Sequence, residues 1–289
     1  MIIAVASGKG GTGKTTVTAS LAVTWPQPVL AVDLDVEEPN LHLFLQPEIL
    51  TTEPVTLEVP EVNEDLCTYC RKCAELCQFK AISVMGQVIM TFPEMCHGCG
   101  GCMAICPEHA ITPGARELGV MEVGLSRGHI HCLTGRLRIG EAMSPPLMRH
   151  VRSHMRAQSA QHGYDVLVDA PPGVSCPAMT AVADADVIVL VTEPTPFGFH
   201  DFALAWEAFA PYAKPMGVVI NRAGLGDTRV YDFCAQHNLP VLTEIPYRRD
   251  IAEHYSHGRI LAERDDQMRQ QFTALGQSIR QMAQEADHA

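Results

Sequence analysis

The chain has 289 residues, of which 47% are hydrophobic, and its formal net charge is −12. That length can bury one large domain core and leave room for a small second domain. The acidic balance argues against the broad basic surface of a protein that coats nucleic acid or anionic lipid. No apolar run reaches the roughly 18 residues that span a bilayer, and the opening residues lack the features of a secretory signal. We therefore expect a cytoplasmic protein with no membrane or nucleic-acid partner.

The first predicted strand, residues 2–6, runs directly into a phosphate-binding sequence. Residues 8–15 read GKGGTGKT and satisfy the pattern GxxxxGK[ST], and a helix-compatible run at 14–24 follows. Glycines let backbone N–H groups approach phosphates, and a helix N-terminus favours their negative charge. We expect Lys14 to meet the β/γ oxygens and Thr15 to bind Mg²⁺. The predicted phosphate site comprises Gly8, Lys9, Gly10, Gly11, Thr12, Gly13, Lys14, Thr15 and Thr16.

Further apolar runs alternate with helix-length segments along the chain. They predict strands at 29–33, 165–168, 187–192, 216–220 and 241–245, and helices at 146–162, 199–210, 228–236 and 267–284. Continuously apolar strands separated by helices predict a doubly wound α/β fold, with a mostly parallel sheet covered on both faces. Carboxylates follow two of these strands, at Asp33, Asp35 and Asp169. The carboxyl edge of such a sheet usually carries its ligand site.

Eight of the eleven cysteines form two copies of one spacing, Cys-x2-Cys-x2-Cys-x3-Cys, and the second copy begins 29 residues after the first. The spacing resembles that of bacterial two-cluster ferredoxins, in which three close cysteines hold one [4Fe–4S] cluster and the fourth binds the other cluster. The resemblance implies one cluster on Cys67, Cys70, Cys73 and Cys106, and a second on Cys96, Cys99, Cys102 and Cys77.

Zinc and disulfides are the alternatives for these cysteines. Zinc favours two CxxC pairs separated by a longer loop, and disulfides need an oxidising compartment. Neither zinc nor disulfides account for two copies of three closely spaced cysteines. Because the segment interrupts the strand–helix alternation, we predict an inserted ferredoxin module at 59–114 and a discontinuous P-loop ATPase domain at 1–58 and 115–289. So short an insert buries little apolar surface, and the clusters are expected to supply much of its folding energy.

Lys9 is an extra lysine within the phosphate loop. It makes residues 9–16 resemble the deviant Walker A ATPases, the MinD/ParA, Mrp and nitrogenase iron protein superfamily. In that family the extra lysine reaches the phosphates of a partner subunit. The resemblance therefore implies ATP hydrolysis in a homodimer, or in a heterodimer with a paralogous ATPase, with Lys9 stabilising charge in trans. The alternative for Lys9 is a solvated loop lysine.

The same resemblance extends to later segments. Residues 31–35 look like the second strand and switch I, which implies that Asp33 lies near Mg²⁺ and that Asp35 orients the attacking water. Residues 166–173 look like Walker B and switch II, with Asp169 as the carboxylate on the Mg²⁺ side. Residues 218–222 and 245–247 resemble the segments around the adenine, which implies base contacts from Asn221, Arg222 and Pro246.

Two other segments have alternative interpretations. Residues 127–156 carry six arginines and four histidines against Glu141 alone, which indicates a solvated helix face or a docking site for an acidic redox partner. In the tail, an apolar stripe occurs at helical spacing, and few basic residues flank it. We expect that helix to pack on the core rather than on a membrane. The stripe comprises Met268, Phe272, Leu275, Ile279 and Met282.

Three cysteines lie outside the repeats. We expect Cys132 and Cys234 to be small buried apolar residues. Cys176 lies seven residues beyond Asp169, where the nitrogenase iron protein carries a cysteine of its dimer-bridging cluster. No second matching cysteine occurs, and the role of Cys176 stays open.

The leading functional hypothesis is an ATPase whose nucleotide state gates electron transfer through two [4Fe–4S] clusters to a redox partner protein. One alternative is an Mrp-like ATPase that assembles or carries iron–sulfur or metal cofactors, although the C-terminal CxxC pair of those relatives is missing here. A positioning ATPase like MinD or ParA is the third hypothesis, which the acidic balance opposes. The expected cofactors are ATP, Mg²⁺ and the two clusters.

Overall fold

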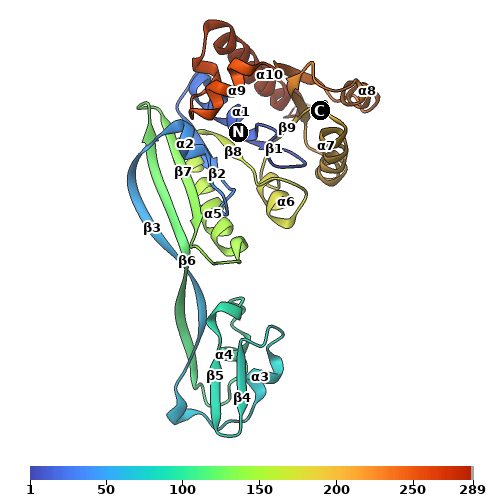
Figure 1. Ribbon diagram of the computed structural model, residues 1–289. Coiled ribbons are helices and arrows are strands. Elements are labelled where there is room, and N and C mark those ends of the chain that lie inside the picture. The colour runs from blue at the N-terminus through green and yellow to red at the C-terminus, as the bar shows by residue number, and fades with distance from the viewer. Residues whose placement is uncertain (288–289) are drawn as a thin grey trace. The chain divides into compact units, whose positions relative to one another are not determined.

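The computed structural model describes residues 1–287 (Figure 1). The strands are β1 (Ile2–Ala6), β2 (Val29–Asp33), β3 (Glu48–Val62), β4 (Ile82–Met85), β5 (Val88–Thr91), β6 (Ile111–Ser126), β7 (Ile130–Leu137), β8 (Asp165–Asp169), β9 (Val187–Thr192), β10 (Met216–Ala223) and β11 (Val241–Pro246). The α-helices are α1 (Lys14–Thr24), α2 (Leu41–Leu45), α3 (Lys72–Leu76), α4 (Gly101–Ile105), α5 (Ser144–His162), α6 (Cys176–Val182), α7 (Pro196–Phe209), α8 (Arg229–Gln236), α9 (Arg249–Ser256) and α10 (Asp266–Asp287). Each predicted strand and helix is confirmed, with ends that differ by a few residues.

Nine strands within residues 1–287 form one sheet, in the order β11-β10-β9-β1-β8-β2-β7-β6-β3. From β11 to β7 all neighbouring strands are parallel. The predicted α/β fold with a mostly parallel sheet is therefore confirmed. Since β1 lies between β8 and β9, the phosphate loop after β1 and Asp169 at the end of β8 lie at the same edge of the sheet.

Helices bury the apolar strands. β2 and β9 are buried along their whole length, as expected for strands covered on both faces. α1 and α10 share one core cluster with β1, and Phe272 and Ile279 of α10 are fully buried in it. The prediction that the tail helix packs on the core is confirmed. Cys132 and Cys234 are also buried, as predicted. No helix within the described residues is both long and apolar enough to cross a membrane.

Strands β3, β6 and β7 lie outside the predicted elements. β3 is the edge strand of the sheet, and its first seven residues are exposed. An edge strand with prolines and polar residues carries no continuous apolar run for a sequence pattern to detect. β6 and β7 are joined by residues 127–129, in which Arg127 and Gly128 have φ values of 51° and 73°. Two successive residues with positive φ are typical of a tight hairpin turn.

The chain divides into two compact units. Unit 1 comprises Met1–Thr52, Met121–Arg136 and the chain from Met148 onward, and unit 2 comprises Glu53–Val120 and Leu137–Leu147. β3 and β6 run from one unit into the other, so the chain changes unit within strands. The proposed insert, residues 59–114, lies within unit 2. In that unit α3 and α4 lie beside the β4–β5 hairpin (Figure 1), and α3 contributes to a small apolar core with β4 and β5.

The basic stretch between residues 127 and 156 is partly neutralised within unit 1. Arg152 and Arg156 both bind Asp184, and Arg127 forms an ion pair with Glu263. Arginines engaged in this way are less available to a partner protein. The structure therefore favours an internally paired surface over a docking site in this segment.

Replacement of Phe272 by Ala tests the packing of α10. The change removes a fully buried ring, and we expect the free energy of unfolding to fall by about 3 kcal/mol because a large cavity remains. Urea denaturation of anaerobically prepared protein measures the effect. The control is Gln270→Ala on the exposed side of the same helix, which should change stability by less than about 0.5 kcal/mol. Equal effects of the two changes would contradict the burial of the stripe.

Candidate nucleotide site

The phosphate loop joins β1 to α1 and depends on glycine. Gly11 and Gly13 have φ values of 75° and 102°, which glycine adopts at little cost. A Cβ atom on Gly13 would lie 2.4 Å from Asn221 Nδ2, so this close approach also needs glycine. Lys14 opens α1 and is 7% exposed. A helix N-terminus with a buried ammonium group is suited to bind phosphate.

Three carboxylates lie near Lys14 at the ends of β2 and β8. Asp33 and Asp169 are register partners on these adjacent strands, and both are buried. Thr15 Oγ1 donates a hydrogen bond to Asp169 Oδ2 at 2.5 Å. Asp35 lines the same cavity as Lys14. Hydroxyl and carboxylate oxygens suit Mg²⁺, so Thr15 and Asp169 fit a magnesium ion held beside the phosphates.

Burial dominates the electrostatics of this group. It raises the pKa of Asp169 to about 6, against the opposing effects of Lys14 and Thr15. Burial and the charge of Asp169 raise the pKa of Asp33 well above its usual range. Burial also raises the pKa of Asp35 and lowers the pKa of Lys14. Because several carboxylates share a site with little water, a divalent cation would relieve their repulsion.

Asp33 has a structural role that the motif did not predict. Its Oδ2 accepts hydrogen bonds from the backbone N–H groups of Asn40 and Leu41, each at 2.9 Å, and its Oδ1 accepts one from Asp35 at 3.0 Å. Leu41 is the first residue of α2, so the carboxylate caps this helix. Asp33 does not belong to the wall of the nucleotide cavity, and its contact with Mg²⁺ stays a prediction.

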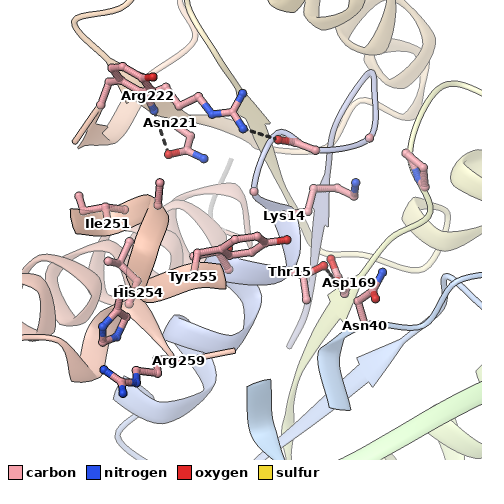
Figure 2. A pocket seen from close by; sticks show the side chains of 18 of the residues that line it. Lys14, Thr15, Asn40, Asp169, Asn221, Arg222, Ile251, His254, Tyr255 and Arg259 are labelled. Atoms are coloured by element: carbon pink, nitrogen blue, oxygen red, sulfur yellow. Dashed lines mark hydrogen bonds between the residues drawn. The ribbon is translucent and has the colours of Figure 1, made fainter. Parts of the chain in front are cut away.

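A cavity of about 380 Å³ gathers most of the predicted nucleotide-binding residues (Figure 2). Its volume suits a small-molecule ligand. The buried Thr12 Oγ1 nearby has no hydrogen-bond partner among the described residues, which fits a polar ligand at the loop. Gly8, Lys9 and Thr12 belong to the loop but not to the cavity wall. The predicted residues on the wall are Gly10, Gly11, Gly13, Lys14, Thr15, Thr16, Asp35, Asp169, Asn221, Arg222 and Pro246.

Residues at the carboxyl end of β10 bind the phosphate loop. Its register with β11 shifts between Asn221 and Ala223, and Arg222 has a φ of 55°, which is costly for a residue other than glycine. Asn221 Nδ2 donates to the Thr12 carbonyl at 2.7 Å, and Arg222 Nη2 donates to the Gly11 carbonyl at 3.3 Å. Both side chains therefore hold the loop, while their contacts with adenine stay predictions.

The motifs did not reveal the wall that α9 contributes to the cavity. Figure 2 shows Tyr255 projecting from α9 into the cavity, with Ile251 and His254 on the same helix. The ring of Tyr255 also contacts Phe44 of α2, with centroids 5.4 Å apart. α9 is a short, polar helix, and so few residues give hydrophobic periodicity little signal.

Lys9 is bound by a residue that sequence reasoning missed, Glu193, which follows β9. Lys9 Nζ lies 2.5 Å from Glu193 Oε1, and Arg222 Nη1 lies 2.5 Å from Glu193 Oε2. Burial would raise the pKa of this carboxyl, but Lys9 and Arg222 lower it below its usual value. The one available signal was an acidic residue directly after a buried strand. Lys9 is therefore not a solvated loop lysine in this structure, because its ammonium is paired with Glu193.

The comparison with known families agrees with this geometry. Residues 3–261 match the CobQ/CobB/MinD/ParA nucleotide binding domain. The chain belongs to this family, and it is an ATP-binding P-loop protein of the MinD/ParA type.

Individual relatives and solved structures support the assignment. Uncharacterized protein MJ0578 of Methanocaldococcus jannaschii is 33% identical over 249 residues, which cover 85% of this chain and 86% of that protein. MJ0579 of the same organism is 28% identical over 271 residues, which cover 92% and 93%. The fold is similar to that of the cell division ATPase MinD of Pyrococcus furiosus, with a TM-score of 0.57, 23% identity and coverage of 97% and 98%. MinD of Pyrococcus horikoshii, solved with Mg-ADP, has the same TM-score and identity, with coverage of 98% and 96%.

Replacement of Asp169 by Asn should stabilise the metal-free protein. The carboxyl has a folded pKa of about 6, above its unfolded value near 4, so ionisation in the folded state becomes costly as the pH rises between about 4 and about 6. At pH 7 we expect D169N to be more stable by about 2 kcal/mol, and this gain should vanish near pH 4. Chemical unfolding in EDTA at both pH values measures it. If D169N and the wild type differed in stability by the same amount at both pH values, the raised pKa of Asp169 would be contradicted.

The D169N variant should lose activity although it gains stability. D169N should lower kcat for ATP hydrolysis by at least about 100-fold, because a preorganised charge is lost from the site. Asp33→Ala and Asp33→Asn separate the two effects of Asp33, because both remove the buried carboxylate and only Asn keeps an oxygen acceptor for the three backbone N–H groups. The Ala variant should be less stable than the Asn variant by about 1–2 kcal/mol, and equal stabilities would contradict the capping role.

Proposed function

We propose that the protein is an ATP-hydrolysing member of this family that carries two [4Fe–4S] clusters in unit 2. Its nucleotide state would gate electron transfer to a partner protein. The proposal rests on two separate cavities in unit 2. Each is lined by three cysteines of one repeat and the fourth cysteine of the other repeat, as the resemblance to two-cluster ferredoxins implies. Cys67, Cys70, Cys73 and Cys106 line one cavity, and Cys77, Cys96, Cys99 and Cys102 line the other.

The second of these cavities has room for a cluster rather than for a single ion. The second cavity has a volume of about 360 Å³, and four cysteines are spread around its wall. A cubane of four irons is wider than one ion, and thiolates are its usual ligands.

The backbone of the two cysteine loops repeats with the sequence. Tyr69 and Arg71 have φ values of 54° and 67°, and their counterparts Gly98 and Gly100 have 65° and 71°. Residues with positive φ in such loops turn N–H groups toward a common side and form anion-binding concavities, as at many iron–sulfur sites. The first repeat keeps this shape without glycine, at a conformational cost. Such conservation of shape between the repeats supports a shared ligand type.

Backbone N–H groups also point at the cysteine sulfurs. The N–H groups of Ala81 and Ala110 donate to Cys77 Sγ and Cys106 Sγ, each at 3.3 Å. Hydrogen bonds to ligand sulfurs help to set the potential of an iron–sulfur cluster. When bound, the clusters would supply one-electron transfer. The chain's part is to hold the thiols and donate these N–H groups.

The nucleotide site is linked to unit 2 through the segment after β2. Asp33 caps α2, and β3 begins at Glu48, shortly after that helix ends. β3 then continues into unit 2. The switch segments of nucleotide-binding proteins respond to the γ-phosphate and its Mg²⁺. A change at Asp33 or Asp35 on nucleotide exchange would therefore act on a strand that enters unit 2.

Two chains would form the active assembly. The extra lysine of the phosphate loop implies hydrolysis in a dimer, with Lys9 acting on the nucleotide of the second chain. Two proteins of one organism match this chain along most of its length, so a paralogous ATPase is a suitable second chain. The acceptor of the electrons would be a further redox protein.

A positioning ATPase is the alternative that the solved MinD structures favour. At 23% identity those structures share the fold alone. The apolar stripe of α10 packs in the core, and the net charge of −12 opposes attraction to anionic lipid. Binding of the MgATP form to anionic vesicles would favour this alternative, and its absence would support ours.

An assembly or carrier ATPase is the second alternative. Full ligation of each cluster by four cysteines favours clusters that stay bound. Incubation with an apo-ferredoxin discriminates, because rapid transfer of the protein's own iron in the presence of a chelator would favour the carrier. Retention of iron over many turnovers of ATP would support electron transfer.

Paired cysteine substitutions test the ligand sets. The intact protein should contain about eight irons per chain. The double variant Cys73→Ser/Cys106→Ser should lose one cluster and keep about four irons, because both residues serve one cavity. Cys73→Ser/Cys77→Ser should lose both clusters. Iron analysis and anaerobic absorption spectroscopy measure the outcome, and the exposed Cys176→Ser variant is the control. Equal iron contents of the two double variants would contradict the crossed ligand sets.

Nucleotide exchange tests the gating. With Mg²⁺ and a non-hydrolysed ATP analogue, we expect the cluster reduction potentials or the rate of electron transfer to an acceptor to differ from those with MgADP. The expected change in rate is about tenfold, a typical coupling between two sites. EPR-monitored redox titration and stopped-flow spectroscopy measure it, and the Lys14→Ala variant is the control without nucleotide binding. Identical potentials and rates in both nucleotide states would remove the gating.

A further inference from the structure

We propose that Glu193 is a positioning residue that holds Lys9 within its own chain until Lys9 transfers to the phosphates of a second chain. The proposal rests on the two-chain arrangement of the proposed function. It adds a residue outside the cavity and the phosphate-loop motif. Glu193 would thereby set how readily two nucleotide-bound chains associate.

The geometry of the contact supports this role. The Lys9 ammonium lies 2.5 Å from Glu193 Oε1, which also accepts a hydrogen bond from Thr195 Oγ1 at 3.1 Å. The carboxylate side chain is 6% exposed, whereas the Lys9 side chain is 28% exposed. A short charge-assisted hydrogen bond to a largely buried acceptor fixes a flexible lysine. Lys9 is therefore turned toward its own chain in this conformation.

The phosphate loop is closely packed just before Lys9 and open just after it, so packing of the backbone does not fix the lysine side chain. A Cβ on Gly8 would lie 1.8 Å from the carbonyl oxygen of Asp201, so the loop is closely packed there. A Cβ on Gly10 would meet nothing within 4 Å. Ser7 Oγ donates to the Lys9 carbonyl at 2.6 Å, which holds its main chain. The Glu193 contact thus decides where the side chain points.

Arg222 is a second cation beside Glu193, so Glu193 is not left unpaired when Lys9 leaves. Its Nη1 lies 2.5 Å from Glu193 Oε2, and Figure 2 shows its side chain extending to the phosphate loop. A buried carboxylate left without any cation is strongly destabilised. With Arg222 in place, Glu193 keeps one partner after Lys9 leaves. Strand β10 holds Arg222 in a left-handed conformation, with a φ of 55°, at the bulge that aims it there.

When Lys9 transfers, its ammonium exchanges the Glu193 carboxylate for a phosphate of the second chain. The ammonium is held 2.5 Å from a carboxylate that is 6% exposed, so in our proposal it leaves this contact when it reaches a phosphate of a second chain. Association of two chains must therefore break the bond to Glu193 before it gains the bond to phosphate. Weakening the first bond should strengthen association, because a ligand shifts an equilibrium by its differential affinity for the two states.

A double-mutant cycle on Glu193 and Lys9 tests the proposal. Analytical ultracentrifugation measures the dissociation constant of the two-chain assembly with Mg²⁺ and a non-hydrolysed ATP analogue. We expect Glu193→Gln to tighten association by about tenfold, because a neutral amide holds the ammonium less strongly. In the Lys9→Ala background the same change should have no effect. Glu207→Gln, which removes an exposed charge from α7, is the control and should match the wild type.

The outcomes separate this proposal from the proposed function. Equal tightening by Glu193→Gln with and without Lys9 would overturn the holding role, since the effect would not pass through Lys9. Unchanged association in Glu193→Gln would overturn it as well, while normal pairing of the wild type would leave the proposed function intact. If no variant pairs at saturating analogue, both the two-chain arrangement and the holding role fail. Thermal unfolding of each variant shows whether the folded state is retained.

Discussion

The structure depends on negative charge that is held out of water at one edge of the sheet. Asp33 and Asp169 are opposite each other on β2 and β8, and Lys14 opens the helix beside them. Burial raises the pKa of both carboxyls, so the folded chain carries a cost that Mg²⁺ would offset. The phosphate loop, the two strand ends and α1 are all arranged around this requirement, which makes the site sensitive to what occupies it.

The same carboxylates connect the site with more distant elements. Asp33 caps α2 rather than facing the cavity, and the chain then enters β3 and unit 2. On the other side of β1, Glu193 joins the phosphate loop to Arg222 at the end of β10. Under the proposed function, a change in charge at the phosphate loop would act in two directions, toward the cysteine-containing unit and toward Lys9. This arrangement would connect the nucleotide site with the proposed iron–sulfur unit along one chain.

The sequence predicted the parts of the molecule that local residues determine. The strands of the parallel sheet are continuously apolar, and the phosphate loop is a contiguous motif, so both were correctly located. β3 was missed because its first seven residues are exposed and give no apolar pattern. Glu193 and the capping role of Asp33 were missed for another reason. Each depends on contacts that only the folded sheet brings together, such as Lys9 with Glu193, which are 184 residues apart.

In the proposed function, nucleotide bound in unit 1 changes unit 2 through the segment after β2. Hydrogen–deuterium exchange on the anaerobic protein tests it most directly, by comparing MgADP with Mg²⁺ and a non-hydrolysed ATP analogue. We expect altered exchange in residues 40–62 and in the cysteine loops at 67–77 and 96–106, in addition to the phosphate loop. Altered exchange confined to the phosphate loop and α9, with residues 40–62 and both cysteine loops unchanged, would contradict it.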